Sequence, residues 1–266
     1  ALASAAHKPG QKFGLRINPQ HSEGATPIYD PCARGSRLGI PIDEFSEADL
    51  GGISGIHFHT LCEQDLPPLQ RTLDVIENKL GWLLPRLEWV NFGGGHHITR
   101  SDYQLEELIE LIRTFSEKYQ LQIYLEPGEA VALDAGVLVT EVLDLKVNDL
   151  QLAILDTSAT CHMPDVIEMP YQPSIRNAAM GTDGAHCYRL GGQTCLAGDV
   201  IGDYSFAHPL QRGQRLVFED MAIYTMVKTN TFNGIPLPSI AIWNSSSGEL
   251  RSVRKFGYED FLQRLS

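Results

Sequence analysis

Several features of other protein classes are missing from this sequence. It has no run of about 18 apolar residues, the length that a membrane-spanning helix needs. No signal-peptide pattern opens it, and no internal repeat or low-complexity segment occurs. We therefore expect a soluble, globular protein that is neither membrane-bound nor disordered.

Cysteine is scarce, and its spacing excludes two kinds of site. The chain has 5 cysteines and no Cys-x-x-Cys pair. An odd number without paired spacing argues against a disulfide framework and against a zinc knuckle. Free thiols are typical of a reducing compartment, so we expect a cytoplasmic protein. The cysteines are Cys32, Cys62, Cys161, Cys187 and Cys195.

Basic residues are in deficit as well. Lysine and arginine number 21 against 33 acidic residues, which gives a formal net charge of -12, and they form no stripe. This charge disfavours a nucleic-acid partner and favours a cationic substrate. Because 43% of the 266 residues are hydrophobic and 20% are charged, the chain can form one large or two modest domains.

Two segments carry the apolar periodicity of a helix. In residues 101–120 the apolar side chains recur on one face, and Ser101 with Gln104 fits a capping box. Residues 67–81 begin with prolines and stop at Gly81. We expect both helices to pack their apolar faces on a sheet. The apolar positions are Leu105, Leu108, Ile109, Ile112, Phe115 and Tyr119 in the first segment, and Leu69, Leu73, Ile76 and Leu80 in the second.

Strand-like segments precede and follow these helices. Four strands separated by helix-sized connections predict a parallel sheet of the TIM-type (β/α)8 barrel kind. Such a barrel needs about eight strands. We therefore expect this chain to hold the C-terminal half of a barrel, with an N-terminal segment outside this sequence. The four segments are residues 12–19, 55–60, 89–95 and 121–128.

After about residue 133 the pattern changes to strands joined by short turns. We expect an α/β plus β organisation, in which residues 1–133 form the barrel half and residues 134–266 form an antiparallel, β-sandwich-like domain. The expected strands lie at residues 136–147, 150–156, 185–190, 215–220, 239–243 and 249–256.

The stretch LQIYLEPGEAV, residues 121–131, ends a strand on a carboxylate. Ligands gather at the carboxyl ends of parallel strands, and a carboxylate there needs a partner. Glu126 can form a structural salt bridge, with Arg16 as one candidate, or can face a protonated aromatic nitrogen of a ligand. The residue alone does not decide between these alternatives.

Two further motifs have the residue types of a ligand site. Gly93, Gly94 and Gly95 follow a strand and precede a helix, where backbone N–H groups can approach a phosphate; a tight turn without a ligand explains them equally well. His57 and His59 alternate so that both imidazoles share one face of a strand. They could bind zinc, but no third ligand has suitable spacing, so we expect no metal site.

The order of the motifs indicates a family. GLRINP, FHTLCE, FGGG, LEPGE, GGQTCLAGD and FEDMAIYTMVKTNTFNG follow one another through nearly the whole chain. In this order they resemble the alanine-racemase-like, fold type III pyridoxal-phosphate decarboxylases, which include ornithine, arginine and diaminopimelate decarboxylases. HTLCE, EPGEA, LDTSATCHMPDVIEMPY and CLAGDVIGDY are most similar to the carboxynorspermidine decarboxylases of that family.

The resemblance implies a reaction in polyamine biosynthesis. Carboxynorspermidine or carboxyspermidine would lose carbon dioxide to give norspermidine or spermidine, with pyridoxal 5'-phosphate as the cofactor. Diaminopimelate, ornithine or arginine is the alternative substrate within the same fold. A catalytically silent regulatory homologue is the alternative from a different class.

The resemblance also implies a role for each matched residue. Glu126 would pair with the pyridine nitrogen and keep it protonated, and His59 would lie against the ring. Arg16 would lie beside the cofactor. Residues 218–234 would return to the barrel mouth, where Tyr224 would hold the phosphate together with Gly93, Gly94 and Gly95.

The remaining roles concern proton transfer and the substrate. In the homodimers of this family, the cysteine matched by Cys195 reaches into the neighbour's site and protonates the carbanionic carbon. The family commonly has an arginine at Glu129, which cannot bind phosphate as a carboxylate, and a serine at Cys62. Diaminopimelate decarboxylases carry an arginine near Glu168, and an acid there favours a substrate with a cationic far end. The residues assigned to the substrate ammonium groups are Glu129, Asp165, Glu168 and Asp199; solvated loop charge is the other explanation for these acids.

The largest departure from the family is an absent lysine. The cofactor-binding lysine of the family lies on an early barrel strand, and none of the lysines in this chain stands in that context. We expect the Schiff-base strand to lie in the N-terminal segment outside this sequence.

Overall fold

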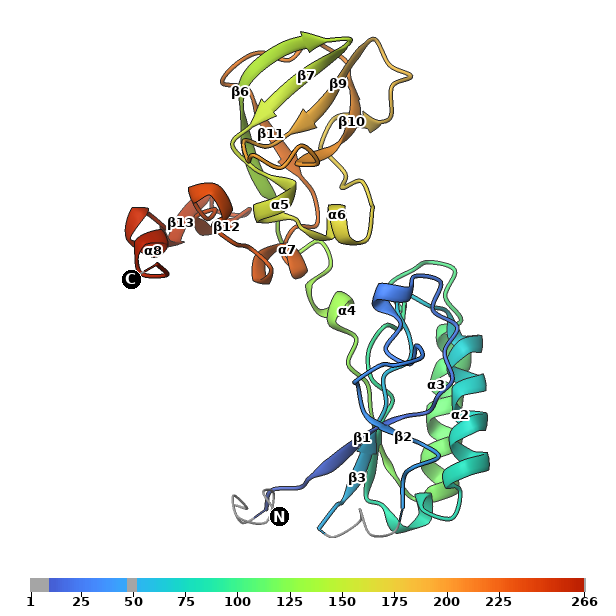
Figure 1. Cartoon of the computed structure of the whole chain (residues 1–266). Coiled ribbons are helices and arrows are strands. Elements are labelled where there is room, and N and C mark those ends of the chain that lie inside the picture. Colours follow the sequence, from blue (N-terminus) through green and yellow to red (C-terminus); the bar gives the residue numbers. More distant parts are fainter. Residues whose placement is uncertain (1–9, 47–51, 266) are drawn as a thin grey trace. The chain divides into compact units, whose positions relative to one another are not determined.

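The chain divides into two compact units, residues 1–131 and 132–266, and each has its own hydrophobic core. The computed structural model describes residues 10–46 and 52–265 (Figure 1). Within these ranges, no helix combines the length and the apolarity that crossing a membrane requires. All of the cysteines are free thiols, as expected from their spacing.

Unit 1 is a parallel sheet with the order β2-β1-β3-β4-β5. The four predicted strands are confirmed as neighbours in a parallel sheet. The sequence pattern missed β2, because a strand of 2 residues has no detectable alternation. The strands are β1 (Gly14–Asn18), β2 (Ile40–Pro41), β3 (Gly55–His57), β4 (Trp89–Asn91) and β5 (Gln122–Tyr124).

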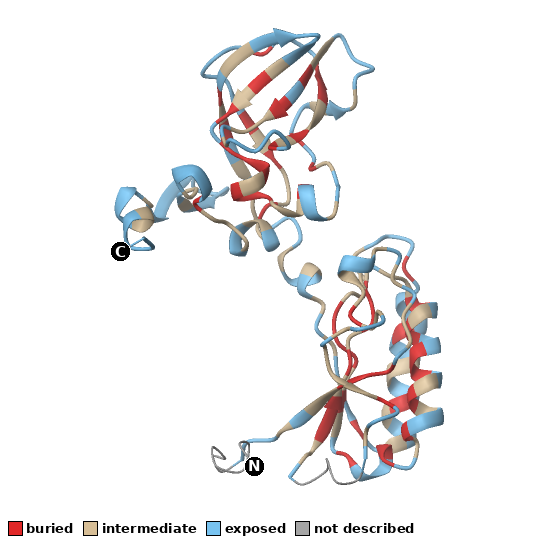
Figure 2. Cartoon of the chain, in the orientation of Figure 1, coloured by how far each residue is buried: buried red, intermediate tan, exposed pale blue. Residues whose placement is uncertain are grey.

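The two long helices of unit 1 cover one face of this sheet (Figure 1). The predicted apolar face of α2 is confirmed, since its four apolar positions are buried (Figure 2). The predicted start of α3 is wrong: Gln104 is the N-cap and makes no side-chain capping bond, and the exposed Leu105 and Ile109 lie off the buried face. The helical elements are α2 (Leu66–Leu80), α3 (Leu105–Tyr119), α4 (Gly128–Ala132), and the 3-10 turns η1 (Pro27–Tyr29) and η3 (Leu84–Arg86).

The other face of the sheet, which we call the inner face, is built in layers set by the strand register. Gly14, Gly55 and Trp89 are register partners across β1, β3 and β4. A Cβ atom on Gly55 would lie 2.1 Å from the Trp89 ring, and one on Gly14 would lie 2.2 Å from it. The indole therefore lies across both glycines. Two residues further along the same strands, Arg16, His57 and Asn91 form the next layer.

Unit 2 contains a six-stranded sheet with the order β11-β6-β7-β9-β10-β8. The prediction of a purely antiparallel domain is wrong at one pair, because β7 and β9 run parallel. The chain between them passes through two helical turns and β8, long enough to return to the same end of the sheet. The strands are β6 (Leu138–Asn148), β7 (Leu150–Leu155), β8 (Ala178–Met180), β9 (His186–Gly191), β10 (Val200–Phe206) and β11 (Arg215–Phe218).

Short helices and a hairpin complete unit 2. The predicted pair of strands near the C-terminus is confirmed as an antiparallel hairpin, whereas β8 and β10 were not predicted. The elements are α5 (Ala159–His162), α6 (Asp165–Glu168), α7 (Tyr224–Val227), η4 (Phe232–Gly234), β12 (Ile240–Asn244), β13 (Glu249–Arg254) and α8 (Tyr258–Leu262).

Candidate active site

Glu126 lies just beyond the carboxyl end of β5. Its N–H donates to Gly93 O (2.8 Å), which ties this strand end to the glycine turn after β4. Oε1 accepts from Asn91 Nδ2 (2.9 Å), and Oε2 lies 3.5 Å from His57 Nε2. The side chain is 51% exposed, so part of the carboxylate is open to a ligand. Arg16 forms no ion pair with Glu126 among the described residues, which removes the salt bridge considered from the sequence.

His57, the last residue of β3, and His59, two residues after it, are both neutral imidazoles near pH 7. Burial is the main cause that lowers the pKa of His57 and of His59, and the charge of Arg16 lowers both further. Gly94 N–H donates to His59 Nδ1 (2.9 Å), which leaves the ring proton on Nε2. His57 Nε2 is buried, and its contact with Glu126 Oε2 at 3.5 Å is longer than an ordinary hydrogen bond. A bound ligand is one means of satisfying such an atom.

The same three side chains have the donor set of a metal site. Ligand atoms of His57, His59 and Glu126 all lie within 4.8 Å of one another. The sequence analysis found no third ligand, because Glu126 is distant in sequence and only the parallel register brings it next to the histidines. The choice between a metal and an organic cation therefore depends on the neighbouring groups.

The glycine turn after β4 is packed too tightly for side chains. A Cβ atom on Gly93 would lie 2.4 Å from Phe58 O, and one on Gly95 would lie 2.1 Å from Leu61 O. Both glycines have positive φ, 74° and 81°. The turn therefore brings backbone rather than side chains to this end of the sheet.

The N–H groups of the three glycines are not equivalent. Gly93 N–H donates to Asn91 Oδ1 (2.8 Å), and Gly94 N–H donates to His59. In the described chain Gly95 N–H has no acceptor. Only Gly95 thus presents a free donor to a phosphate, whereas Gly93 and Gly94 hold the side chains that surround Glu126.

Glu129 lies on α4 beside the same strand ends. Its Oε1 accepts from Thr99 Oγ1 (2.8 Å) and lies 3.6 Å from His97 Nε2. A role in substrate binding stays a prediction for this residue.

The Cys195 loop of unit 2 is organised around Asp199. The carboxylate of Asp199 is only 5% exposed and accepts hydrogen bonds from Ser158 Oγ (2.9 Å), Thr194 N–H (3.1 Å) and Thr194 Oγ1 (2.7 Å). Asn233 Oδ1 accepts from Cys195 N–H (2.7 Å), and the cysteine itself is exposed. The buried carboxylate of Asp199 is thus already satisfied by the loop that it organises, and its role in substrate binding stays a prediction.

A second charged group of unit 2 joins α6 to the end of α7. Lys228 Nζ lies 2.5 Å from Asp165 Oδ1 and 3.1 Å from Glu168 Oε2. It also lies 5.5 Å from the ring centroid of Tyr224, which is exposed. The sequence analysis named the two acids and the tyrosine but missed this role of Lys228, because no local pattern relates residues so far apart.

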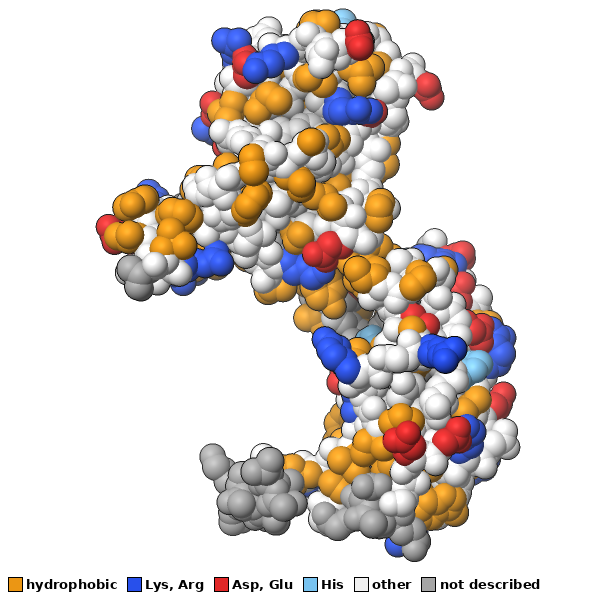
Figure 3. Space-filling view, in the orientation of Figure 1, with side chains coloured by type: hydrophobic (Ala, Val, Ile, Leu, Met, Phe, Trp, Pro, Cys, Tyr) orange, Lys and Arg blue, Asp and Glu red, His pale blue; other side chains and the backbone are white. Residues whose placement is uncertain are grey.

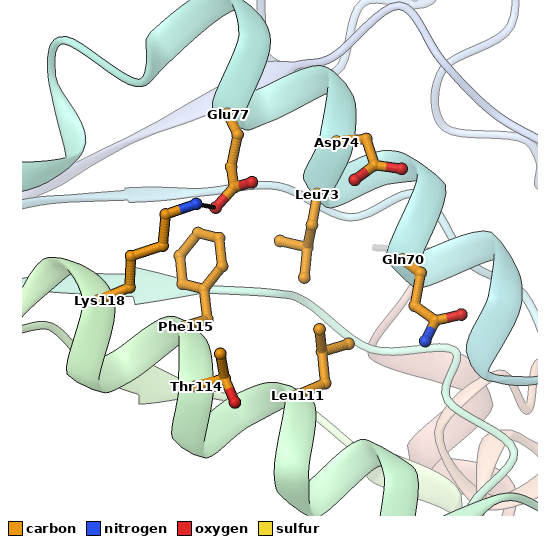
Figure 4. Close-up of a pocket in the computed structure, with 8 residues that line it drawn as sticks. All are labelled: Gln70, Leu73, Asp74, Glu77, Leu111, Thr114, Phe115 and Lys118. Carbon is orange, nitrogen blue, oxygen red and sulfur yellow. Dashed lines mark hydrogen bonds and ion pairs between the residues drawn. The ribbon is translucent and has the colours of Figure 1, made fainter.

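A hollow lies elsewhere, between α2 and α3 on the outer face of unit 1. It has a volume of about 310 Å³, and an ion pair of 2.8 Å between Lys118 and Glu77 lies at one end (Figure 4). None of the site residues lines it. On the molecular face that Figure 3 shows, acidic and basic side chains are interspersed and form no basic stripe.

The inner-face residues fit a pyridine ring and its phosphate. An exposed carboxylate after β5, a neutral imidazole after β3 and a free glycine N–H after β4 lie at the same end of the sheet, and His57 Nε2 makes only a long contact with Glu126. The described part of unit 1 supplies no Schiff-base lysine there, since its lysines lie at the amino ends of the strands or on the outer helices. Each of these lysines forms an ion pair with an acidic side chain: Lys12 with Glu88, Lys79 with Asp43, and Lys118 with Glu77.

Comparison with known proteins gives concordant matches. The family described as pyridoxal-dependent decarboxylase, C-terminal sheet domain, matches residues 27–222. Carboxynorspermidine/carboxyspermidine decarboxylase of Campylobacter jejuni is 45% identical over 263 residues, which cover 95% of this chain and 69% of that protein. Carboxyaminopropylagmatine decarboxylase of Synechocystis sp. is 47% identical over 256 residues, covering 96% of this chain and 66% of that protein.

Solved structures give the same result. The crystal structure of carboxynorspermidine decarboxylase from Campylobacter jejuni, complexed with norspermidine, superposes with a TM-score of 0.84 at 44% identity, covering 96% of this chain and 69% of that one. Diaminopimelate decarboxylase from Helicobacter pylori has a TM-score of 0.78 at 20% identity, covering 96% and 66%, and shares the fold. The chain thus spans about two thirds of the relatives that it matches. It belongs to the pyridoxal-dependent decarboxylases.

Proposed function

We propose that this protein removes the α-carboxyl group of carboxynorspermidine or carboxyspermidine, giving norspermidine or spermidine in polyamine biosynthesis. The relative from Campylobacter jejuni supports this reaction. The observation that carries the substrate assignment is the acid pair of α6, Asp165 and Glu168, which already holds an ammonium group, that of Lys228. A site of this kind suits a substrate with a cationic far end.

Bound pyridoxal phosphate supplies a cationic ring that accepts the electrons left behind when carbon dioxide departs. Glu126 would hold the proton on the ring nitrogen, and the hydrogen bond from Asn91 to Oε1 orients the carboxylate for this role. His59 lies against the ring as a neutral imidazole, so it adds no positive charge beside the cationic ring. Gly95 N–H would donate to the phosphate, and Arg16, in the same layer as His57, would lie beside the cofactor.

Proton return is the role of Cys195. When carbon dioxide leaves, the electron pair of the broken bond would stay on the α-carbon and be delocalised into the ring; the Cys195 thiol would then give its proton to that carbon, forming the new C–H bond and leaving a thiolate. We propose that the protein works as a homodimer, in which Cys195 of one chain serves the site of its partner. The exposed thiol and the anchored loop support this role.

The substrate ammonium groups are assigned to the acids that remain accessible. These are Asp165 and Glu168 on α6. Glu129 on α4 of unit 1 is a separate candidate for a substrate ammonium group. The net charge of -12 favours the approach of such a polycation. We place the reaction in the cytoplasm, where the free thiols persist.

A second candidate substrate is carboxyaminopropylagmatine. The relative from Synechocystis sp. is as similar to this chain as the one from Campylobacter jejuni, and both match nearly all of it. The name of this substrate indicates an agmatine end, whose guanidinium is also cationic, so the same acids suit it. Diaminopimelate is less suitable, since an acid stands near Glu168 in place of the arginine that would meet its distal carboxylate. Ornithine and arginine have a cationic far end, and what disfavours them is the similarity of this chain to the relatives from Campylobacter jejuni and Synechocystis sp..

Carbon dioxide release by the holoenzyme tests the proposal. Carboxynorspermidine, carboxyspermidine and carboxyaminopropylagmatine should be turned over well, and diaminopimelate, ornithine and arginine at least about tenfold less efficiently. Equal or better turnover of any of the last three would overturn the substrate assignment. Failure of borohydride to bleach the cofactor absorbance would indicate a silent homologue instead.

A further inference from the structure

Lys228 is the cationic member of the charged group of α6 and α7. Its Nζ is within hydrogen-bond distance of Asp165 Oδ1 (2.5 Å) and Glu168 Oε2 (3.1 Å). These three side chains are 31%, 17% and 48% exposed for Lys228, Asp165 and Glu168, respectively. Glu168 and part of Lys228 are therefore open to solvent and to a competing cation, whereas Asp165 is largely covered.

Lys228 also contacts Tyr224, the residue proposed to hold the phosphate. Its N–H donates to Tyr224 O (2.9 Å) and ends the single turn of α7. Its ammonium lies 5.5 Å from the Tyr224 ring. One lysine thus connects the acid pair assigned to the substrate with the tyrosine assigned to the phosphate.

The charges of the group have a direct consequence for binding. Two carboxylates attract a substrate ammonium, and Lys228 neutralises one of their two negative charges. A partly exposed ion pair contributes little net free energy, so an incoming ammonium can replace the lysine at the carboxylates. The substrate ammonium must therefore compete with Lys228 for the two carboxylates.

We infer that Lys228 is a specificity-determining residue that occupies the subsite of the substrate's distal ammonium and is displaced when the substrate binds. This inference rests on the proposed function. It explains how a site with two acids can release a polycationic product: the lysine returns as the product ammonium leaves. The lysine acts as a competing internal ligand.

Calorimetric titration of the holoenzyme with norspermidine tests this role. Lys228→Met should bind norspermidine about three- to tenfold more tightly than the wild type, because the competitor is gone and the subsite carries two negative charges. Lys228→Gln should change the affinity in the same direction, and Lys228→Arg should leave it near the wild-type value. Asp165→Asn is the matched control and should weaken binding. A merely structural lysine would give weaker binding in the first two variants.

The outcomes separate the inference from the proposed function. Equal or weaker norspermidine binding by Lys228→Met and Lys228→Gln, with wild-type binding intact, would overturn the role of Lys228 alone. No norspermidine binding by the wild type would contradict both. Thermal unfolding of each variant confirms that a changed affinity belongs to folded protein.

Discussion

Asn91 Nδ2 donates a hydrogen bond of 2.9 Å to Glu126 Oε1, and Asn91 Oδ1 accepts one of 2.8 Å from the N–H of Gly93. One amide therefore fixes the carboxylate and the glycine turn together. The strand register places Asn91 opposite His57, on the inner face of the sheet. We interpret Asn91 as the residue that positions Glu126 toward the cofactor ring.

This relationship predicts the effect of removing the amide. Asn91→Ala should lower kcat/KM for carboxynorspermidine by about 10- to 100-fold, because Glu126 loses the bond that orients it. Asn91→Asp should be at least as damaging, since it places a second negative charge beside Glu126. In a Glu126→Gln background the Asn91→Ala substitution should cost little. A full additional loss in that background would show that Asn91 does not act through Glu126.

The Cys195 loop gives a second prediction. Cys195→Ala should lower kcat strongly, by about 100-fold or more, because the proton donor is lost. Asn233→Ala should lower kcat by about tenfold with little change in KM, since only the backbone anchor at Cys195 N–H is lost.

Asn233→Asp is the matched control for this anchor. Aspartate keeps an acceptor oxygen and tolerates the positive φ of 57° at this position, so it should restore most of the activity. Equal losses in the alanine and aspartate variants would contradict a positioning role.

Stability should depend on pH through His162. Its Nδ1 accepts from Thr157 Oγ1 (2.9 Å) and Ser158 N–H (3.2 Å), and its Nε2 donates to Pro236 O (3.0 Å). Burial lowers the pKa of this imidazole below the ordinary value of about 6.5. As the pH falls below that value, the unfolded chain takes up the proton first, so the free energy of unfolding decreases.

Urea unfolding between pH 7.5 and pH 5 measures this dependence. The wild type should lose stability steadily over the lower half of this range, together with contributions from the other buried histidines. His162→Gln should be less stable at pH 7.5 but should show a shallower slope. An unchanged slope in this variant would mean that His162 does not contribute to the pH dependence.

The close packing of the Trp89 indole on Gly55 predicts that a larger residue at position 55 destabilises the protein. Gly55→Ala should destabilise the protein by about 1–3 kcal/mol, because its Cβ atom would lie 2.1 Å from the indole. In a Trp89→Ala background the same change should cost little, since the ring is absent. Chemical denaturation of the four proteins of this cycle measures the coupling, and additive losses would exclude a direct clash.

Much of unit 1 follows from local sequence. The periodicity of Leu69, Leu73, Ile76 and Leu80 predicted α2 and its buried face, because burial on a sheet requires that spacing. The start of α3 was misplaced, since Ser101 has the residue type of a cap but makes no capping bond. In unit 2, β8 and β10 were missed and the parallel pair was not foreseen, because long-range pairing selects the partners of a strand.

Part of the candidate site could be named from the sequence. Glu126, His59 and the glycines stand at strand ends, and the structure brings them together, whereas their binding of the cofactor stays a prediction. Asn91, Asn233 and Lys228 were missed, because each acts through a partner far away in the chain. Asn91 had one weak signal, a polar residue two positions before the glycine turn and on the same face.

The most direct test compares two efficiencies in one experiment: kcat/KM for carboxynorspermidine and kcat/KM for diaminopimelate, in the wild type and in Glu168→Arg. We predict that the wild type favours carboxynorspermidine by about tenfold or more and that Glu168→Arg lowers this ratio by a similar factor, because the arginine repels a distal ammonium and attracts a distal carboxylate. A wild-type enzyme that prefers diaminopimelate, or a ratio that the substitution leaves unchanged, would contradict the assignment of α6 to a cationic substrate.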